Sequence, residues 1–267
     1  MPRRRRLLFP RLWPGVRRTF RVLLSAPAGL QFVLIAILAV GLWAAGNWVY
    51  HAVRKPTELL FPVSDALAKT PAETWREYGP LFRRYATAVI TPEFLAALAQ
   101  IESAGNPLAQ TYWRWNLSWH PLEVYRPASS AVGMYQITDG TFAQTRRECR
   151  QDLARPGGDS SPAPGSCWLD SLYSRVVPGE AIELTATLLD GAVAGTLRRQ
   201  RISRATQQQK HDLAAVIHLC GAGAGEGYAR RGFRLTPGQR CGDHDVRGYL
   251  ARVNAMKRQF ARLAGES

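Results

Sequence analysis

The chain of 267 residues carries 35 Lys and Arg against 20 Asp and Glu, and 46% of its residues are hydrophobic. This is enough apolar material for one full core with a short appendage. With 10% aromatic and only 21% charged residues, most of the chain is not intrinsically disordered. The net charge of +15 predicts an acidic partner, yet eight Arg and no acid lie in residues 1–27, which leaves +7 for the rest. Much of the charge therefore belongs to a tail, which weakens an interpretation as a nucleic-acid-binding protein.

Residues 28–50 form a run of 23 positions without a charged side chain. A helix that crosses a bilayer needs about 20 predominantly apolar residues. Aromatic residues gather at the C-terminal end of the run, where an aromatic belt is expected: Trp43, Trp48 and Tyr50. A cleaved signal peptide and a buried core helix remain alternatives, but the run is longer than the usual apolar region of a signal peptide and apolar on all sides.

Positive charge is much denser before the apolar run than after it, where only Arg54 and Lys55 follow closely. The positive-inside rule then places the N-terminus in the cytoplasm. We therefore expect a basic cytoplasmic tail over residues 1–27, an uncleaved single-pass helix over 28–50 in the inner membrane, and a periplasmic C-terminal part.

Beyond the apolar run, residues 51–88 are interrupted by four prolines and are expected to form a connector with short helical pieces over 57–69 and 73–85. From Val89 onward the pattern is helical with loops, so residues 89–267 are expected to form one mainly α domain.

One predicted helix places a carboxylate on its apolar side. Thr91 and Pro92 form a typical N-cap and first helical position, and the helix ends at Ala104-Gly105-Asn106-Pro107. Glu102 shares the helix side of Leu95 and Leu98 and lies in the last turn. Partial burial and the negative end of the helix dipole both favour the protonated form that a general acid needs. A solvated Glu at a fraying helix end is the alternative.

Four short segments carry a resemblance to a known family. The order I-E-S-A-G-N-P at residues 101–107, followed by S-A-V-G-M-Y-Q-I-T at 130–138, resembles the soluble lytic transglycosylase (SLT) family. Residues 222–225, A-G-A-G, match the end of a third motif in which Cys220 and Gly221 stand where Tyr and Asn are usual. Residues 245–253 look like the closing motif, which carries a Tyr. The resemblance covers roughly residues 89–255.

The resemblance implies a goose-type-lysozyme-like helical fold that cuts peptidoglycan, with no cofactor and no metal. It implies that Glu102 is the general acid and base and that Tyr249 points at its carboxylate. The residues that it implies bind or line the substrate near Glu102 are Ser103, Gly133, Met134, Tyr135 and Gln136.

The reaction implied by this resemblance needs only one carboxylate. Retaining and inverting glycosidases normally use two, and the candidates for a second are Glu123, Asp139 and Glu148, none of them in a motif. A muramic acid substrate removes the need, because its 2-acetamido group stabilises the oxocarbenium-like centre and its 6-hydroxyl closes a 1,6-anhydro ring.

All four Cys follow the apolar run, on the oxidising side of the predicted membrane. Four Cys allow three pairings, of which we expect the sequence-local one, Cys149–Cys167 and Cys220–Cys241. A zinc site with His211, His218 or His244 is the alternative, but no C-x-x-C occurs.

Aromatic, glycine-rich and basic segments of the chain suggest further binding functions. Tyr112, Trp113, Trp115 and Trp119 are suited to a glycan groove or to core packing. The glycines of residues 221–227 suggest a dinucleotide site, but Leu213, Val216, Ile217 and Cys220 before them follow helical rather than strand spacing, which disfavours it. The basic C-terminal segment is expected to be the solvated face of a packed helix, with binding to DNA or anionic lipid as the alternative.

The expected partners are peptidoglycan glycan strands and the inner membrane, without nucleic acid, with an envelope-spanning secretion or conjugation complex as a further candidate. The competing interpretations of the whole chain are a non-catalytic, membrane-anchored peptidoglycan-binding scaffold and a lysozyme-type muramidase.

Overall fold

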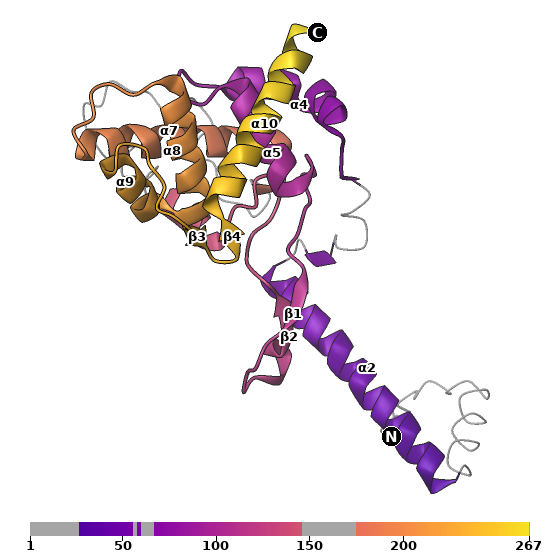
Figure 1. Cartoon of the computed structure of the whole chain (residues 1–267). Coiled ribbons are helices and arrows are strands. Elements are labelled where there is room, and N and C mark those ends of the chain that lie inside the picture. Colours follow the sequence, from indigo (N-terminus) through magenta and orange to yellow (C-terminus); the bar gives the residue numbers. More distant parts are fainter. Residues whose placement is uncertain (1–26, 56–57, 60–66, 146–174, 267) are drawn as a thin grey trace, which may run out of the picture. The chain divides into compact units, whose positions relative to one another are not determined.

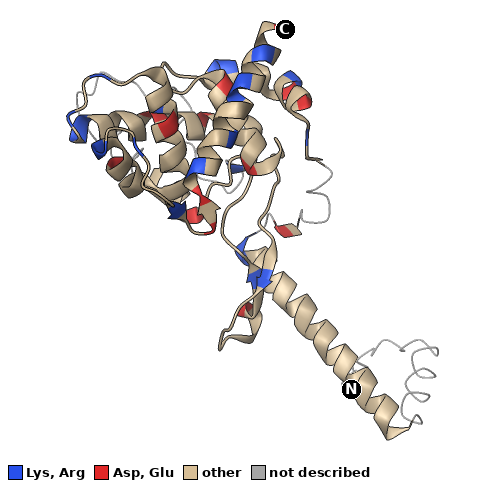
Figure 2. Ribbon diagram, in the orientation of Figure 1, with Lys and Arg blue, Asp and Glu red and all other residues tan. Residues whose placement is uncertain are grey.

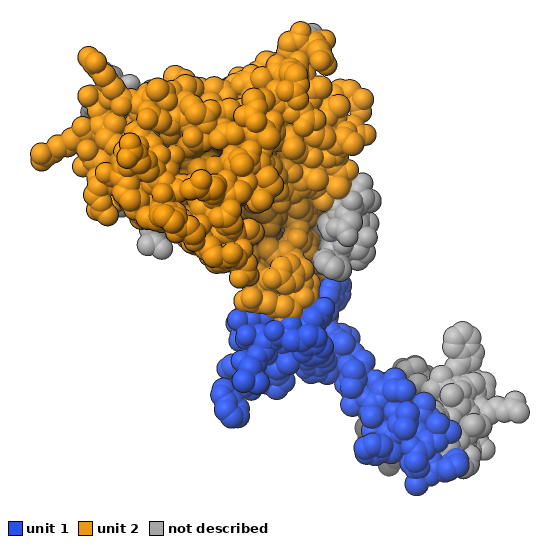
Figure 3. Space-filling model, in the orientation of Figure 1, with its two compact units in different colours: residues 1–54, 115–126 blue, residues 55–114, 127–267 orange. Residues whose placement is uncertain are grey.

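The computed structural model describes residues 27–55, 58–59, 67–145 and 175–266, and the elements in these ranges are mainly helices (Figure 1). The chain forms two compact units (Figure 3). Unit 1 comprises residues 1–54 and 115–126, and unit 2 comprises residues 55–114 and 127–267. The chain therefore leaves unit 1, enters unit 2, returns to unit 1 and enters unit 2 again.

Unit 1 is built on the helix α2, Ala28–Arg54. Its 27 residues correspond to about 40 Å at about 1.5 Å per residue, more than the hydrocarbon core of a bilayer, about 30 Å. An 18-residue window of α2 has a mean hydropathy of 2.2, and Figure 2 shows almost no charge along it. By length and composition, α2 is a candidate membrane anchor or signal sequence, and it extends beyond the predicted span to Arg54.

A short hairpin completes unit 1. Strand β1, Trp113–Trp115, pairs with strand β2, Tyr125–Pro127, and the 3₁₀ helix η3, Pro121–Glu123, lies between them. The helical pattern of the sequence did not predict these strands.

The labelled helices of unit 2 are α4 (Pro71–Tyr85), α5 (Pro92–Ser103), α7 (Pro178–Arg199), α8 (Gln207–Cys220), α9 (Ala222–Arg230) and α10 (Val246–Gly265), and residues 139–145 are also helical. Helix α5 lies at the centre, packed against α4, α7 and α10, and α8 packs against α7, α9 and α10 (Figure 1). Phe94, Leu95 and Leu98 of α5 are fully buried. The expected mainly helical, lysozyme-like architecture is confirmed.

Helix α5 begins and ends where the sequence predicts. The Thr91 hydroxyl accepts a hydrogen bond from the backbone N–H of Phe94 at 3.4 Å, which satisfies one of the free donors of the first turn. Ala104 ends the helix in the left-handed region, and Gly105 follows with φ +67°. A Cβ on Gly105 would clash with the Thr74 side chain, so the end of α5 packs tightly on α4.

Helix α4 matches the helical piece expected over residues 73–85 and begins two residues earlier. It is continuous through Pro80, although a proline removes one helical hydrogen bond. Trp75, Tyr78 and Phe82 are buried in the same core as α5. The burial of these aromatic side chains offsets the cost of Pro80, and it makes α4 part of the same core as α5.

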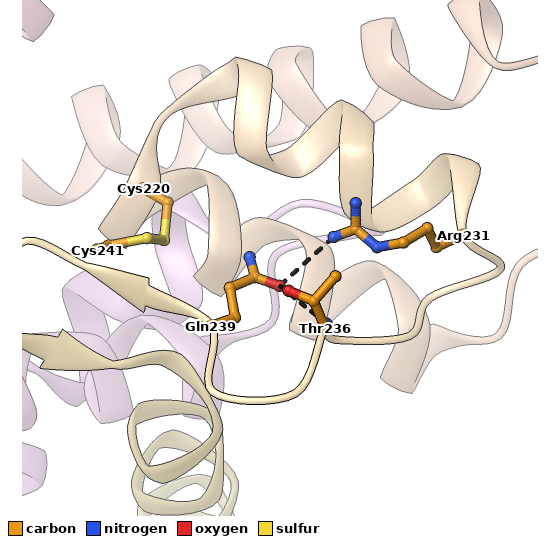
Figure 4. Close-up of a disulfide and its surroundings, with 5 residues drawn as sticks. All are labelled: Cys220, Arg231, Thr236, Gln239 and Cys241. Carbon is orange, nitrogen blue, oxygen red and sulfur yellow. Dashed lines mark hydrogen bonds between the residues drawn. A yellow bond between two sulfur atoms is a disulfide. The ribbon is translucent and has the colours of Figure 1, made fainter.

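The end of α8 is fixed by a disulfide. Cys220, the last residue of α8, is bonded to Cys241 at the end of strand β3 (Arg240–Cys241), with a Cα–Cα distance of 5.5 Å (Figure 4). Strand β3 pairs with β4 (His244–Asp245), and the Gln239 side chain accepts from Thr236 in the preceding turn (Figure 4). The predicted Cys220–Cys241 bridge is confirmed, whereas Cys149–Cys167 lies outside the described residues.

Candidate active site

Glu102 occupies the last turn of α5, next to the buried side of the helix. Its side chain is 17% exposed, so the carboxylate is partly withdrawn from water but still reachable from outside. Leu98 and Leu95, one and two turns earlier on this side, are fully buried and hold the helix in place. A carboxylate in this position can exchange a proton with a bound molecule.

Tyr249, from the first part of α10, donates a hydrogen bond from its hydroxyl to Glu102 Oε1 at 2.6 Å. The start of α10 is held by Asp245, whose carboxylate accepts from the Gly248 backbone N–H at 2.7 Å. Tyr249 is only 2% exposed. Burial first, and then the adjacent negative charge of Glu102, raise the pKa of Tyr249 well above its usual value. The phenol therefore stays protonated and remains a hydrogen-bond donor at neutral pH.

His218, in the last turn of α8, is the third group at this carboxylate. Its Nε2 lies 3.6 Å from Glu102 Oε1, and its side chain is 14% exposed. Sequence reasoning considered His218 only as a zinc ligand and did not place it near Glu102. Its position two residues before Cys220, next to the third motif, is the signal that could have found it.

Ser103 connects α5 to the loop that carries G-M-Y-Q. Its hydroxyl lies 2.9 Å from the carbonyl oxygen of Met134 and 3.0 Å from that of Ala99, and it donates towards both. Because the hydroxyl has a single proton, these carbonyls compete for it. Ser103 therefore fixes the loop directly beside Glu102.

The G-M-Y-Q loop is a tight turn closed by its own residues. Gln136, with φ +49°, donates from Nε2 to the carbonyls of Gly133 at 3.0 Å and Ala109 at 3.2 Å. Gly133 has φ +78°, and a Cβ there would lie 2.0 Å from the Arg175 carbonyl oxygen. Only glycine fits at this position.

Met134 and Tyr135 are both fully buried. Burial raises the pKa of Tyr135 well above its usual value, and no hydrogen-bond partner for its hydroxyl occurs within the described ranges. The resemblance implied that these side chains line a groove. The turn instead directs both side chains into the core, where their apolar area is removed from water. Their packing there stabilises the loop.

Arg175 is a buried residue that the sequence did not single out. Its guanidinium donates to the carbonyl of Ile137 at 3.1 Å and lies 2.7 Å from Asp139 Oδ1. A buried guanidinium requires such partners, and these hold the chain that follows Gln136.

The candidate second carboxylates are either paired with basic groups or outside the described residues. Asp139 pairs with Arg175, and Glu123, in unit 1, lies 3.7 Å from Arg54. Glu148 lies outside the described residues. The described part of the chain also contains no cluster of three His, Cys, Asp or Glu suited to a metal ion.

The four aromatic residues after α5 differ in their surroundings. Tyr112, Trp115 and Trp119 are exposed, whereas the indole N–H of half-buried Trp113 donates to the buried carboxylate of Glu58 at 3.0 Å. Trp115 and Trp119 belong to unit 1.

Comparison with known families identifies the domain that holds this site. Residues 81–189 match the model of the Transglycosylase SLT domain. The chain therefore carries an SLT, lysozyme-like domain, as the sequence resemblance predicted. Curated proteins provide no match to the chain at a significant level. The matched region includes Glu102 and the G-M-Y-Q loop, while His218 and Tyr249 come from helices that follow it.

Proposed function

We propose that this SLT-domain chain is a membrane-anchored lytic transglycosylase that cleaves the MurNAc–GlcNAc β-1,4 bond of peptidoglycan without water. The observation that supports it best is the carboxylate of Glu102, partly exposed and held by a buried phenol at 2.6 Å inside an SLT domain. The SLT domain itself supports a transglycosylase-type action on peptidoglycan.

In the first step, protonated Glu102 gives its proton to the glycosidic oxygen, and the bond from C1 of MurNAc to that oxygen breaks. The 2-acetamido group of the sugar stabilises the positive charge that develops at C1. The Tyr249 hydroxyl donates to the carboxylate as it becomes negative, which stabilises the transition state more than the ground state.

In the second step, the 6-hydroxyl oxygen of the same sugar forms a bond to C1, and its proton passes to the Glu102 carboxylate. The product is 1,6-anhydroMurNAc, and the enzyme regains its starting protonation state. One carboxylate therefore serves as acid and then as base. The basic partners of Asp139 and Glu123 agree with a mechanism that needs no second catalytic carboxylate.

We further propose that α2 anchors the chain in the inner membrane with the SLT domain in the periplasm. The apolar character of α2 and the eight Arg that precede it support this orientation. A wall-cutting domain on this side of the membrane would serve wall remodelling or the passage of an envelope-spanning secretion or conjugation complex.

The test is Glu102→Gln in the full chain, assayed on purified sacculi with products identified by mass spectrometry. Gln keeps the shape but cannot transfer a proton, and general acid–base catalysis contributes about 10²- to 10⁴-fold, so we expect a loss of at least about 10²-fold. Glu93→Gln, the same change in the first turn of the same helix, is the matched control and should remain active.

The products separate the alternatives. Anhydro ends, one water lighter than reducing ends, support the proposal. A digest with only reducing ends indicates a lysozyme-type muramidase, and binding to sacculi without any cleavage by the wild type indicates a non-catalytic scaffold. Full activity of Glu102→Gln would disprove the role of Glu102.

A further inference from the structure

The β1–β2 hairpin lies along the C-terminal half of α2 within unit 1. Three α2 side chains hydrogen bond to backbone carbonyls of the hairpin, at 2.7–3.0 Å: Trp43 to Pro121, Asn47 to Tyr125 and His51 to Leu122. The Trp43 and Trp115 rings also stack, with centroids 6.1 Å apart and planes inclined by 10°. Residues 115–126 are therefore attached to α2 over more than two helical turns.

These contacts fall at the outer end of the candidate span. About 20 residues from Ala28, enough for the hydrocarbon core, bring the helix to Asn47. Trp43 lies four residues earlier, about 6 Å further in at about 1.5 Å per residue. The hairpin is thus fastened to the helix where the hydrocarbon region gives way to the headgroups.

Asn47 indicates that this attachment belongs in an apolar environment. It is an amide that follows a long apolar stretch of α2, and it is only 2% exposed because the hairpin covers it. Its Nδ2 donates to the Tyr125 carbonyl at 2.7 Å. Without the hairpin, this N–H donor would face lipid unsatisfied, which is costly in a bilayer.

The tip of the hairpin, residues 115–122, carries no charge and exposes large apolar side chains. Leu117 and Trp119 are completely exposed, and Trp115 is mostly exposed. Residues 115–122, W-N-L-S-W-H-P-L, contain no acid, Lys or Arg, while Arg114 and Arg126 flank the loop. Trp prefers the membrane–water interface, and Arg beside it suits the anionic headgroups. This combination matches a bilayer surface better than water.

We propose that residues 115–122 insert into the outer-leaflet interface of the membrane that α2 crosses, with Leu117 and Trp119 among the lipid chains and headgroups. The proposal rests on the proposed membrane anchoring of α2. Its consequence follows from the course of the chain, because unit 2 is connected to unit 1 both through Arg54–Lys55 and through the two strands of the hairpin. A domain attached through several chain connections has fewer orientations available than one attached through a single linker.

The test uses the full chain in vesicles of phosphatidylethanolamine and phosphatidylglycerol, with an environment-sensitive fluorophore on one added cysteine. The variants are Trp119→Cys and Leu117→Cys in the hairpin, Val40→Cys in α2 and Arg230→Cys on the exposed end of α9. The parent chain without an added cysteine supplies the background. Quenching is measured with spin-labelled lipids, carrying the label at a shallow or a deep acyl position, and with aqueous iodide.

We expect the labels at positions 117 and 119 to lose fluorescence mainly to the shallow lipid quencher and to be protected from iodide. The label at position 40 should respond to the deep quencher, and that at position 230 to iodide. Two hairpin positions are used so that one disturbed side chain does not decide the result.

The outcomes keep the two proposals apart. Iodide quenching at positions 117 and 119, with lipid quenching at position 40, would overturn the hairpin proposal and leave the anchor intact. The same result is expected if the exposed tip binds a protein partner, because these vesicles contain only lipid. Iodide quenching at position 40 would overturn the anchor and the hairpin proposal together.

Discussion

Replacing Tyr249 by Phe removes one hydroxyl from the candidate active site and leaves the ring in the core. The lost group is the donor to Glu102 Oε1 at 2.6 Å. A hydrogen bond to a charged group contributes about 1.5–3 kcal/mol. If that energy acts fully on the carboxylate that forms in the transition state, kcat should fall by about 10-fold to about 100-fold, at about 1.4 kcal/mol per factor of ten.

The same change should affect stability much less. Glu102 is 17% exposed, so water can replace the lost phenol as a donor in the folded protein. We expect the free energy of unfolding to fall by about 1 kcal/mol or less. A large loss of kcat with nearly unchanged stability and KM would identify Tyr249 as a residue that positions Glu102, rather than one that only fills the core.

The assay measures release of anhydro-ended products from soluble glycan strands by the full-chain protein, with kcat and KM determined separately. Tyr228→Phe is the matched control, because Tyr228 is a buried tyrosine of the same domain whose ring packs against Phe233. A kcat of Tyr249→Phe within twofold of the wild type, in a folded protein, would refute the reasoning. An equal loss in Tyr228→Phe would show that the effect is not specific to the Glu102 contact.

Two further predictions concern stability. The double change Cys220→Ser and Cys241→Ser removes a disulfide with a sequence separation of 21. In the chain-entropy model, the free energy of unfolding should fall by about 3 kcal/mol, measured by urea unfolding. In the presence of a reductant, the unfolding curves of the wild type and the variant should coincide. Burial, followed by repulsion from Lys257, lowers the pKa of His211 from 6.5 to about 4. The unfolded chain therefore binds a proton more readily than the folded chain. The free energy of unfolding, which receives the full contribution of neutral His211 above about pH 6.5, should fall by up to about 3 kcal/mol as the pH drops to about 4. Urea unfolding should show a smaller fall with pH in His211→Gln, and the same fall as the wild type in the variant of the exposed His244, His244→Gln.

Local patterns in the sequence predicted the parts of the fold that depend on neighbouring residues. The uncharged run predicted α2, and the Thr91-Pro92 start and Ala104-Gly105 stop predicted the limits of α5. Caps, helix-breaking residues and apolar runs act over a few positions, so they can be read along the chain. The helical piece expected over residues 73–85 agrees with α4, where the burial of Trp75 and Phe82 offsets the helix-breaking preference of Pro80.

The contacts between distant segments were beyond such patterns. The attachment of Trp115 to Trp43, and the turn that buries Met134 and Tyr135, depend on how elements pack rather than on their composition. An exposed and a buried aromatic residue look alike in a sequence without clear periodicity. The four aromatic residues after α5 therefore could not be assigned to surface or core beforehand.

The site around Glu102 depends both on a local sequence motif and on contacts between distant segments. The family resemblance locates the carboxylate and implies that Tyr249, 147 positions away, points at it, which the hydrogen bond at 2.6 Å confirms; the packing of α10 on α5 brings the two together. Cys220 stands where the resemblance expects a Tyr, and it forms the bridge that holds the end of α8 to β3. The groups that reach Glu102 are His218, two residues before Cys220 in α8, and Tyr249 in α10. Although the third motif lacks its usual Tyr, the Glu102 carboxylate still has neighbours from α8 and α10. The kinetics of Tyr249→Phe measure how much the neighbour from α10 contributes to catalysis.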